Sequence, residues 1–348
     1  MQPDRPLLTI AIPTYNRSAF LAELLAVLAP QLPDEPFVEL LISDNASPDD
    51  TPTVVSRFRD AGMKCKYLRN DVNIGADANF LECFREAAGK YVWIVGDDDI
   101  IVPGALRRIR RLLTEVEYDL VFVRPYGFEQ RFDEKKVSDP FGRTALAIRN
   151  PRLFAEMTGV MLTFISAVIV NKERLKSISA PDPARLLGTN LIQLGWVLPL
   201  LAEYRIGLFV FGGLVAGKRD NSGGYDISKV FGSNLKTVTH DLLQPRQDLV
   251  ERIVNNTLRC WFPDKVLEER KNTHPESELK DIHKFLKAIF GDNFRYWLFV
   301  FPAIKAPIWF VELLLYFHNR IILRMESGFR AIFQAVFLRK CYVSFDDD

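Results

Sequence analysis

The sequence lacks several features by which a protein's chemistry is most often recognised. Its 45 basic and 44 acidic residues leave a formal net charge of +1, so there is no overall basic field to attract nucleic acid. The four histidines stand far apart and form no metal-binding spacing. The four cysteines include no CxxC pair, which favours reduced, buried thiols in a cytosolic protein.

The sequence also contains no internal repeat and no low-complexity tract. Apolar residues make up 48% of the 348 positions and charged residues 26%, proportions typical of a globular protein. This length allows two lobes that share a core, or one domain with appendages. The first residues lead directly into a strand-like segment rather than a signal peptide, so we expect no export.

The first 125 residues alternate between strand and helix patterns. Apolar runs predict buried strands at residues 7–12, 37–42, 66–68 and 91–95, and we expect the first to stop at Pro13. Amphipathic segments predict helices from residue 20, after Asp49 and Asp50, and from about residue 78 to Gly89. This alternation implies an α/β fold with a mostly parallel sheet and helices on both faces.

Polar residues follow each predicted strand, at residues 13–17, 44–47, 69–75 and 97–99. In open α/β sheets, ligands bind beyond the carboxyl ends of the strands. The four polar segments should therefore converge on one edge of the sheet and form a single binding site there.

The second half of the sequence is less regular. We expect a buried strand at residues 164–170, a helix at 186–201 and a strand at 206–211. Helical periodicity dominates from residue 240 onward, with a charged linker over residues 265–280.

Three adjacent carboxylates, Asp97, Asp98 and Asp99, follow the fourth strand directly. Carboxylates at the end of a buried strand are costly unless a cation neutralises them. Mn²⁺ and Mg²⁺ take oxygen ligands from one or two carboxylates together with substrate phosphates. The triplet therefore predicts a Mn²⁺ or Mg²⁺ site formed by Asp97, Asp98 and Asp99.

Four segments together resemble glycosyltransferase family 2 in their order and spacing. They are TIAIPTYNR at residues 9–17, ISDNAS at 42–47, RNDVNIG at 69–75 with Asn79 after it, and AGKYVWIVGDDD at 88–99. SDNAS combined with GDDD most resembles the abequosyltransferase-like O-antigen enzymes of that family. The resemblance covers roughly residues 7–125 and implies a Rossmann-like GT-A fold that binds a nucleotide-sugar donor.

The same resemblance implies roles for individual residues. Pro13 and Tyr15 would flank the base and ribose of the donor, and Asp44 would accept a hydrogen bond from the base. Asp97 would hold the ribose or the metal, while Asp98 and Asp99 would place the metal on the diphosphate. Further donor-pocket residues would be Asn45, Arg69 and Asn73. Independently of the resemblance, the glycines at residues 217–224 allow mobility, so we expect Lys218 and Arg219 to close over the diphosphate. Two local alternatives stay open, a half-buried core aromatic for Tyr15 and an Asx-turn for Asp44.

The catalytic base is not evident from the sequence. Many inverting relatives carry a Glu-Asp pair near the start of a helix in the second half, but this sequence has no Glu-Asp dipeptide. The matching position is at residues 187–190, which contain no carboxylate. Either another acid such as Asp182 or Asp220 is the base, or the reaction retains the anomeric configuration.

The C-terminal region combines apolar and basic residues. Residues 294–317 are strongly apolar and aromatic, but prolines and Lys305 argue against a spanning helix. Residues 320–337 place seven large apolar side chains on one helical face and polar residues opposite. This pattern predicts an in-plane helix on an anionic membrane. The alternative is a helical pair that packs on the catalytic core or on a second subunit.

We therefore expect a peripheral glycosyltransferase on the cytoplasmic face of the inner membrane. Residues 1–125 would bind the nucleotide sugar, 126–240 the acceptor and 241–348 the membrane. The acceptor would be a polyprenyl-diphosphate-linked glycan in surface-polysaccharide or O-antigen synthesis, and an oligomer is compatible with the sequence. One rival is a sugar-phosphate nucleotidylyltransferase, which should have a Gly-rich loop after the first strand. A second is a degenerate, non-catalytic membrane scaffold, in which the acidic triplet should be lost.

Overall fold

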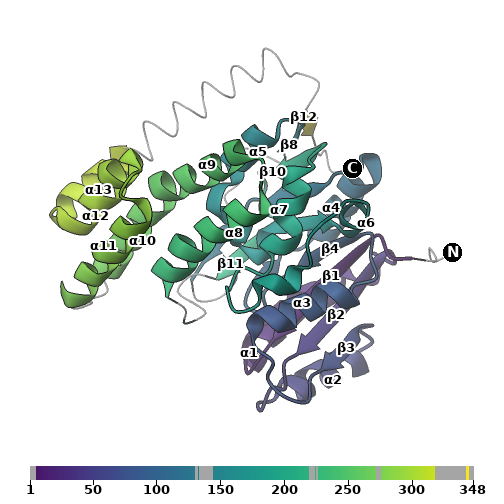
Figure 1. The fold of residues 1–348 in the computed structure, drawn as a ribbon. Helices are drawn as coiled ribbons and strands as arrows, with labels where there is room; N and C mark the ends of the chain where they lie inside the picture. The colour runs from purple at the N-terminus through teal and green to yellow at the C-terminus, as the bar shows by residue number, and fades with distance from the viewer. Residues whose placement is uncertain are drawn as a thin grey trace.

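The computed structural model describes residues 5–129, 132, 144–218, 224, 226–271, 276–317 and 342–344. Its large sheet has the strand order β12-β8-β10-β6-β9-β4-β1-β2-β3 (Figure 1). In chain order these strands are β1 Leu8–Thr14, β2 Val38–Asp44, β3 Lys66–Arg69, β4 Tyr91–Ile94, β6 Leu120–Val123, β8 Thr144–Ile148, β9 Val168–Asn171, β10 Gly207–Val210 and β12 Tyr342–Ser344. A small sheet joins β5 Ile100–Ile101, β11 Val215–Lys218 and β7 Tyr126–Phe128.

The large sheet is mostly parallel, as the sequence predicts. β4, β1, β2 and β3 pair in parallel, and β10 pairs in parallel with β6. Strands β9 and β8 run in the opposite direction. β9 pairs antiparallel with β4 and with β6, whereas β8 pairs antiparallel with β10 and with β12. An antiparallel β9 begins at the edge where its neighbours end, which brings the residues before it into the predicted site.

Helices cover both faces of this sheet. Alternate β-strand side chains pack against α1 Ser18–Leu28, α2 Thr51–Asp60 and α4 Ala105–Glu115 on one face. The other side chains pack against α3 Ala76–Glu86, α5 Pro151–Thr158, α7 Leu194–Ala202, α8 Leu235–Leu242 and α9 Gln247–Asn256. Both faces of each central strand are thus buried, which explains why these strands are continuously apolar in the sequence.

Pro13 does not end the first strand, contrary to expectation. β1 continues to Thr14 and stays in register with β2, where Pro13 lies opposite Ser43 and Thr14 opposite Asp44. The pairing of β1 with β4 ends at Ala11, so the missing N–H of Pro13 falls beyond the last pair on that side.

Gly89 is not the C-terminal cap of a helix. Helix α3 ends at Glu86, and Gly89 is not among the glycines with positive φ. A Cβ on Gly89 would lie 2.6 Å from the main-chain nitrogen of Thr9, so glycine is required by the close approach of this turn to β1.

The second half differs from the expected pattern in three places. A 3₁₀ turn, Ile165–Ala167, precedes β9, which begins only at Val168. α7 begins at Leu194 because Gly188 and Asn190, before it, adopt positive φ angles that a right-handed helix cannot include. The expected charged linker is largely helical, formed by α10 Phe262–Lys271 and α11 Glu276–Phe290.

The last described helices form a separate apolar cluster beside the sheet domain (Figure 1). A π-helical turn, Tyr296–Val300, leads into α12 Phe301–Lys305, and α13 Ile308–Phe317 follows. The segment at residues 320–337, predicted to be an in-plane helix, lies outside the described residues. Within the part of the chain that is described, no helix combines the length and apolar composition needed to cross a bilayer.

Candidate active site

The register of β1 and β2 places two polar clusters side by side at one edge of the sheet. Thr14 lies opposite Asp44 at the carboxyl ends of these strands, and the main-chain nitrogen of Asn45 donates to the carbonyl of Thr14 at 2.9 Å. The Thr14 hydroxyl also donates to Oδ2 of Asp97 at 2.7 Å. Thr14 therefore joins a cluster around Asp44 to a cluster around the acidic triplet.

Asp97 is buried and is held by two hydrogen bonds. It is 4% exposed and accepts hydrogen bonds from Thr14 and from Nη1 of Arg17, the latter at 3.1 Å. Burial raises the pKa of Asp97 to about 6, and Arg17 limits that rise. Such a carboxylate is held in place by the protein rather than by solvent.

Asp99 is equally buried and connects distant parts of the chain. Oδ2 accepts a hydrogen bond of 2.5 Å from the hydroxyl of Ser166, and Oδ1 accepts one of 3.1 Å from the main-chain nitrogen of Lys218. Burial and the neighbouring charge of Asp98 raise the pKa of Asp99 to about 7. Ser166 also accepts from the main-chain nitrogen of Gly96, so it fixes the turn that carries the triplet.

Asp98 has the most accessible carboxylate of the three. Its side chain is 15% exposed, and Oδ2 lies 3.4 Å from Nη1 of Arg17. Three adjacent carboxylates, two of them with raised pKa values, form a set of hard oxygen donors that suits Mg²⁺ or Mn²⁺. Among the described residues no three His, Cys, Asp or Glu side chains form a ready-made metal cage. A cation here would therefore depend on one or two carboxylates and on oxygens from a ligand.

The second cluster surrounds Asp44, which is completely buried. Its Oδ1 accepts from the main-chain nitrogen of Ser47 at 2.8 Å, and its Oδ2 accepts from the Tyr67 hydroxyl at 2.7 Å. Nε of Arg69 lies 3.4 Å from the same Oδ2. Burial and the bond to Asp44 raise the pKa of Tyr67 well above its ordinary value.

An asparagine network continues this cluster into the third loop. The Asn45 side chain is 2% exposed; its Nδ2 donates to Oδ1 of Asn73 at 2.8 Å. Oδ1 of Asn45 accepts from Nδ2 of Asn70 and from the main-chain nitrogen of Ile74. Asn45 and Asn73, both predicted from the sequence, are thus brought into direct contact.

Exposed apolar and aromatic side chains lie beside these polar groups. Tyr15 follows the buried Pro13 and is 42% exposed, which does not fit the core-aromatic alternative. Val72 and Ile74, in the third loop, are 65% and 44% exposed. The sequence of the third loop gives no reason to expect exposed apolar residues. Val72 and Ile74 offer the apolar contacts that a planar ring of a ligand requires.

Lys218 contacts the triplet through its main chain rather than its ammonium group. Nζ lies 5.2 Å from the ring centroid of Phe20 and 5.0 Å from that of Phe128, and 4.0 Å from Oε2 of Glu23. Arg219 and Asp220, the other two residues predicted for this segment, lie outside the described residues.

The structure does not bring Asp182 to the triplet. Its side chain is 67% exposed and lies 3.3 Å from Nη2 of Arg85, in the last turn of α3. Because α3 begins after the carboxyl end of β3 and leads back to the start of β4, its last turn lies at the opposite edge of the sheet. Asp182 also caps a short 3₁₀ turn, which accounts for its position.

A carboxylate that sequence reasoning missed contacts the loop at the expected catalytic-base position. Asp77, in the first turn of α3, is 8% exposed and accepts from the main-chain nitrogen of Asn190 at 2.9 Å. Burial raises the pKa of Asp77, although the main-chain amides of residues 188, 189, 190 and 192 limit the rise. From the other side, Nδ2 of Asn234 donates to the carbonyl of Thr189 at 3.0 Å. The loop at the expected catalytic-base position is thus fixed from both halves of the chain.

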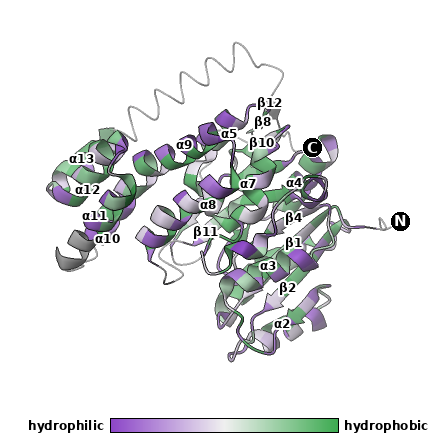
Figure 2. Ribbon diagram, in the orientation of Figure 1, coloured by the Kyte–Doolittle hydropathy of each residue, from purple (hydrophilic) through white to green (hydrophobic). Residues whose placement is uncertain are grey.

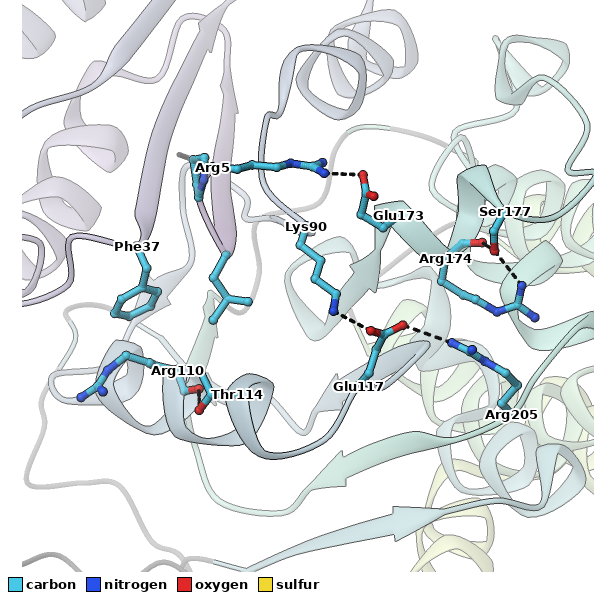
Figure 3. Close-up of a pocket in the computed structure, with 12 residues that line it drawn as sticks. Arg5, Phe37, Lys90, Arg110, Thr114, Glu117, Glu173, Arg174, Ser177 and Arg205 are labelled. Atoms are coloured by element: carbon cyan, nitrogen blue, oxygen red, sulfur yellow. Dashed lines mark hydrogen bonds and ion pairs between the residues drawn. The ribbon is translucent and has the colours of Figure 1, made fainter. Parts of the chain in front are cut away.

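A cavity of about 770 Å³ lies at the opposite edge of the sheet, near the start of β1. Figure 3 shows that its basic residues face acidic partners, with Arg5 directed at Glu173 and Lys90 at Glu117. Arg205 pairs with Asp119, which is buried beneath. These pairs make the cavity a structural ion-pair network, separate from the triplet.

Comparison with known proteins gives consistent matches. Residues 9–174 match the glycosyl transferase family 2. Abequosyltransferase RfbV of Salmonella typhimurium is 32% identical over 204 residues, which cover 53% of this chain and 58% of that protein. The GalNAc(5)-diNAcBac-PP-undecaprenol beta-1,3-glucosyltransferase of Campylobacter jejuni is 31% identical over 111 residues, or 32% of this chain and 35% of that protein. The matched segments thus span little more than half of these relatives at most.

Solved structures support the same architecture. Residues 1–349 of Staphylococcus aureus TarS in complex with UDP match with a TM-score of 0.58 at 15% identity, over 90% of this chain and 91% of that chain. At this identity the match shows the fold alone. Strand order, the polar edge and the family match agree with one another: the protein has a GT-A-like fold, and its residues 9–174 match the glycosyl transferase family 2.

Proposed function

We propose that this protein transfers a sugar from a nucleoside-diphosphate sugar to a glycan acceptor. The observation that supports this most directly is the hydroxyl of Thr14, which links the Asp44 cluster to the acidic triplet. One cluster can hold a nucleoside and the other its diphosphate. The donor half at residues 1–125 and the acceptor half at 126–240 then meet at this edge of the sheet.

The nucleoside would bind between Tyr15 and the third loop. Tyr15, Val72 and Ile74 present exposed apolar surface for the base. Asp44 lies beneath, fully buried, and its oxygens already accept from Ser47 and Tyr67, so it orients the pocket. It would accept a hydrogen bond from the base only after the side chains that cover it move aside. Pro13, Asn45, Arg69 and Asn73 would complete the donor pocket.

The diphosphate would lie over the triplet. Asp98 and Asp99 would hold Mn²⁺ or Mg²⁺, and Asp97 would fix the ribose or the metal. A bound divalent cation neutralises the charge that develops on the departing nucleoside diphosphate. The acceptor hydroxyl oxygen forms the new bond to the anomeric carbon as the bond from that carbon to the diphosphate breaks, and the hydroxyl proton passes to a base.

The acceptor would be a lipid-linked glycan in surface-polysaccharide or O-antigen synthesis. The names of the Salmonella and Campylobacter relatives support this class, because one denotes an abequosyltransferase and the other a transferase acting on an undecaprenol-linked glycan. An acceptor of this kind is confined to a membrane surface, so the enzyme would act there.

The last described helices offer a surface for that membrane. Of the ten residues of α13 only Val311 is buried, and its one charged residue, Glu312, pairs with Lys271 at 2.7 Å. A helix that is apolar on all sides is normally covered by protein or lipid. In Figure 2 much of α12 and α13 carries the apolar colour, as parts of the sheet domain also do. The exposed apolar side chains of this surface are Phe294, Trp297, Leu298, Ile308, Trp309, Phe310, Leu313, Leu314, Tyr316 and Phe317.

Charge near this surface favours an anionic bilayer over a neutral partner. The guanidinium of Arg295 lies 4.4 Å from the Phe294 ring centroid, and Nζ of Lys287 lies 5.6 Å from that of Trp297. Aromatic side chains with flanking cations are typical of interfacial helices. The enzyme would thus be peripheral, on the cytoplasmic face of the inner membrane.

The proposed activity can be tested in two steps. Thermal unfolding with each nucleoside diphosphate and Mn²⁺ should reveal one that raises the melting temperature, since a ligand bound only by the native state stabilises it. Transfer from the matching nucleotide sugar to a polyprenyl-diphosphate-linked glycan should then be detectable in vesicles. If no nucleoside diphosphate stabilises the protein in the presence of Mn²⁺ and no product forms, the proposed function is wrong.

A further inference from the structure

Arg17 places a cation inside the acidic triplet. Nη1 lies 3.1 Å from Oδ1 of Asp97 and 3.4 Å from Oδ2 of Asp98. The side chains of Asp97 and Asp98 are 5% and 15% exposed, so these ion pairs are largely shielded from water. The guanidinium also lies 5.6 Å from the ring centroid of Phe20. Arg17 therefore neutralises part of the charge that a divalent cation would otherwise neutralise.

The main chain on both sides of Arg17 is fixed. The nitrogen of Asn16 donates to the Ser47 hydroxyl at 2.9 Å, and that of Ser18 donates to Oδ2 of Asp49 at 2.8 Å. The carbonyl of Arg17 accepts from Leu21, which closes the first turn of α1. The Arg17 side chain is nevertheless 31% exposed. A change in the position of Arg17 would thus involve its side chain, which is partly exposed to solvent.

A guanidinium and a divalent cation cannot share Oδ2 of Asp98 without strong repulsion, since like charges at contact distance repel strongly when they are partly shielded from water. We propose that Arg17 occupies Asp98 while no divalent cation is bound and gives up this carboxylate when Mn²⁺ or Mg²⁺ binds. Arg17 thereby lowers the affinity of the empty enzyme for metal. This inference rests on the metal site of the proposed function.

Mn²⁺ binding to the full-length protein without nucleotide tests this directly. Arg17→Gln removes the competing charge and should bind Mn²⁺ at least about fivefold more tightly than the wild type, measured by calorimetry or by the EPR signal of free Mn²⁺. Arg17→Lys retains the positive charge and should stay closer to the wild type. Arg69→Gln is the matched control, because it removes one positive charge at the same edge from Asp44 instead.

The outcomes separate this inference from the proposed function. If the wild type binds Mn²⁺ and Arg17→Gln, shown to be folded by circular dichroism, binds it no more tightly, competition by Arg17 is wrong while the metal site stands. If Arg69→Gln tightens binding as much as Arg17→Gln does, the effect is one of general charge and the inference also fails. If no variant binds Mn²⁺, both the inference and the metal site are wrong.

Discussion

The hydroxyl of Thr14 and the carboxylate of Asp97 are 83 positions apart in the sequence but form a hydrogen bond of 2.7 Å in the buried part of the site. The bond joins the end of β1 to the turn after β4. Replacing this hydroxyl tests whether the two clusters work as one site.

Thr14→Val keeps the shape of the side chain but removes the donor to Asp97. A buried carboxylate that loses one hydrogen bond should cost about 1–3 kcal/mol of unfolding free energy. Nucleoside-diphosphate affinity should fall as well, because the triplet and the Asp44 cluster lose their shared contact. Thr14→Ser retains the donor and should restore most of both properties. Urea unfolding and calorimetry measure the two effects, and equal behaviour of the valine and serine variants would contradict the prediction.

Asp98 and Asp99 should respond differently to substitution, although both are proposed metal ligands. Asp98→Asn should abolish metal-supported transfer with little change in stability, because Asp98 is the more exposed of the two. Asp99→Ala should cost activity and also about 1–3 kcal/mol of stability, because it leaves the Ser166 hydroxyl and the Lys218 main-chain nitrogen without their acceptor. Transfer assays with added chelator and melting curves distinguish the two. Full transfer activity in the presence of chelator would contradict the assignment of Asp98 and Asp99 as metal ligands.

Tyr67→Phe tests the proposed nucleoside pocket without replacing a charged residue. It removes the hydroxyl that donates to Oδ2 of Asp44 at 2.7 Å. Asp44 should then be less firmly oriented, and nucleoside-diphosphate affinity should fall by about tenfold, equivalent to roughly 1.4 kcal/mol. Asp44→Asn should weaken binding further. Unchanged affinity in both variants, measured by calorimetry, would return Asp44 to a purely local role in the turn after β2.

The sequence predicts well which polar residues meet at this edge of the sheet, for a physical reason. Strands buried on both faces must be continuously apolar, so their ends are visible where polar residues begin. The parallel arrangement then brings Asp44, Asn73 and Asp97 to one edge. No such pattern marks Ser166, because a single serine 67 positions from Asp99 carries no signal. It enters the site only because β9 runs antiparallel to β4.

The positions of Asp182 and of the loop at residues 188–192 could not be predicted in the same way. Asp182 was a candidate on composition alone, and its position depends on the packing of a 3₁₀ turn against the end of α3. Asp77 reaches the loop at residues 188–192 through main-chain amides, and such contacts leave no trace in residue type. The prediction that a helix ends at Gly89 is wrong for a related reason, because the close approach of Gly89 to Thr9 is a tertiary contact.

An ion-pair group between α5 and α9 predicts a pH dependence of stability. Asp248 accepts from Arg246 and from Arg152 of α5, the latter at 2.7 Å, and these bonds lower its pKa. A carboxylate with a lowered folded-state pKa stabilises the fold above its unfolded pKa of about 3.9, and this contribution is lost as the pH falls further. Asp248→Asn should therefore be less stable than the wild type at pH 7 in urea unfolding, and the difference should shrink towards pH 3.

The control for this effect is Asp241→Asn, at an exposed position. It should change stability little at either pH. A difference between wild type and Asp248→Asn that stays constant from pH 7 to pH 3 would mean that packing, and not charge, accounts for the loss.

The exposed surface of α13 distinguishes a membrane-bound enzyme from an oligomeric one. Trp309 and Leu313 are 66% and 44% exposed, and each could contribute up to roughly 1.5–3 kcal/mol if fully transferred from water. Burial at an interface is partial, so Trp309→Glu with Leu313→Glu should weaken binding to phosphatidylglycerol vesicles by at least about tenfold, or roughly 1.4 kcal/mol. Binding of the wild type should weaken with salt, because cations such as Arg295 contribute through a screened attraction to the anionic surface.

Val116→Glu is the control for this prediction. It replaces a residue that is 39% exposed on another part of the molecule, and the variant should bind vesicles as the wild type does. The wild type could instead fail to bind the vesicles and sediment as a dimer, with the double variant sedimenting as a monomer. In that case this surface is a subunit interface and the membrane proposal is wrong.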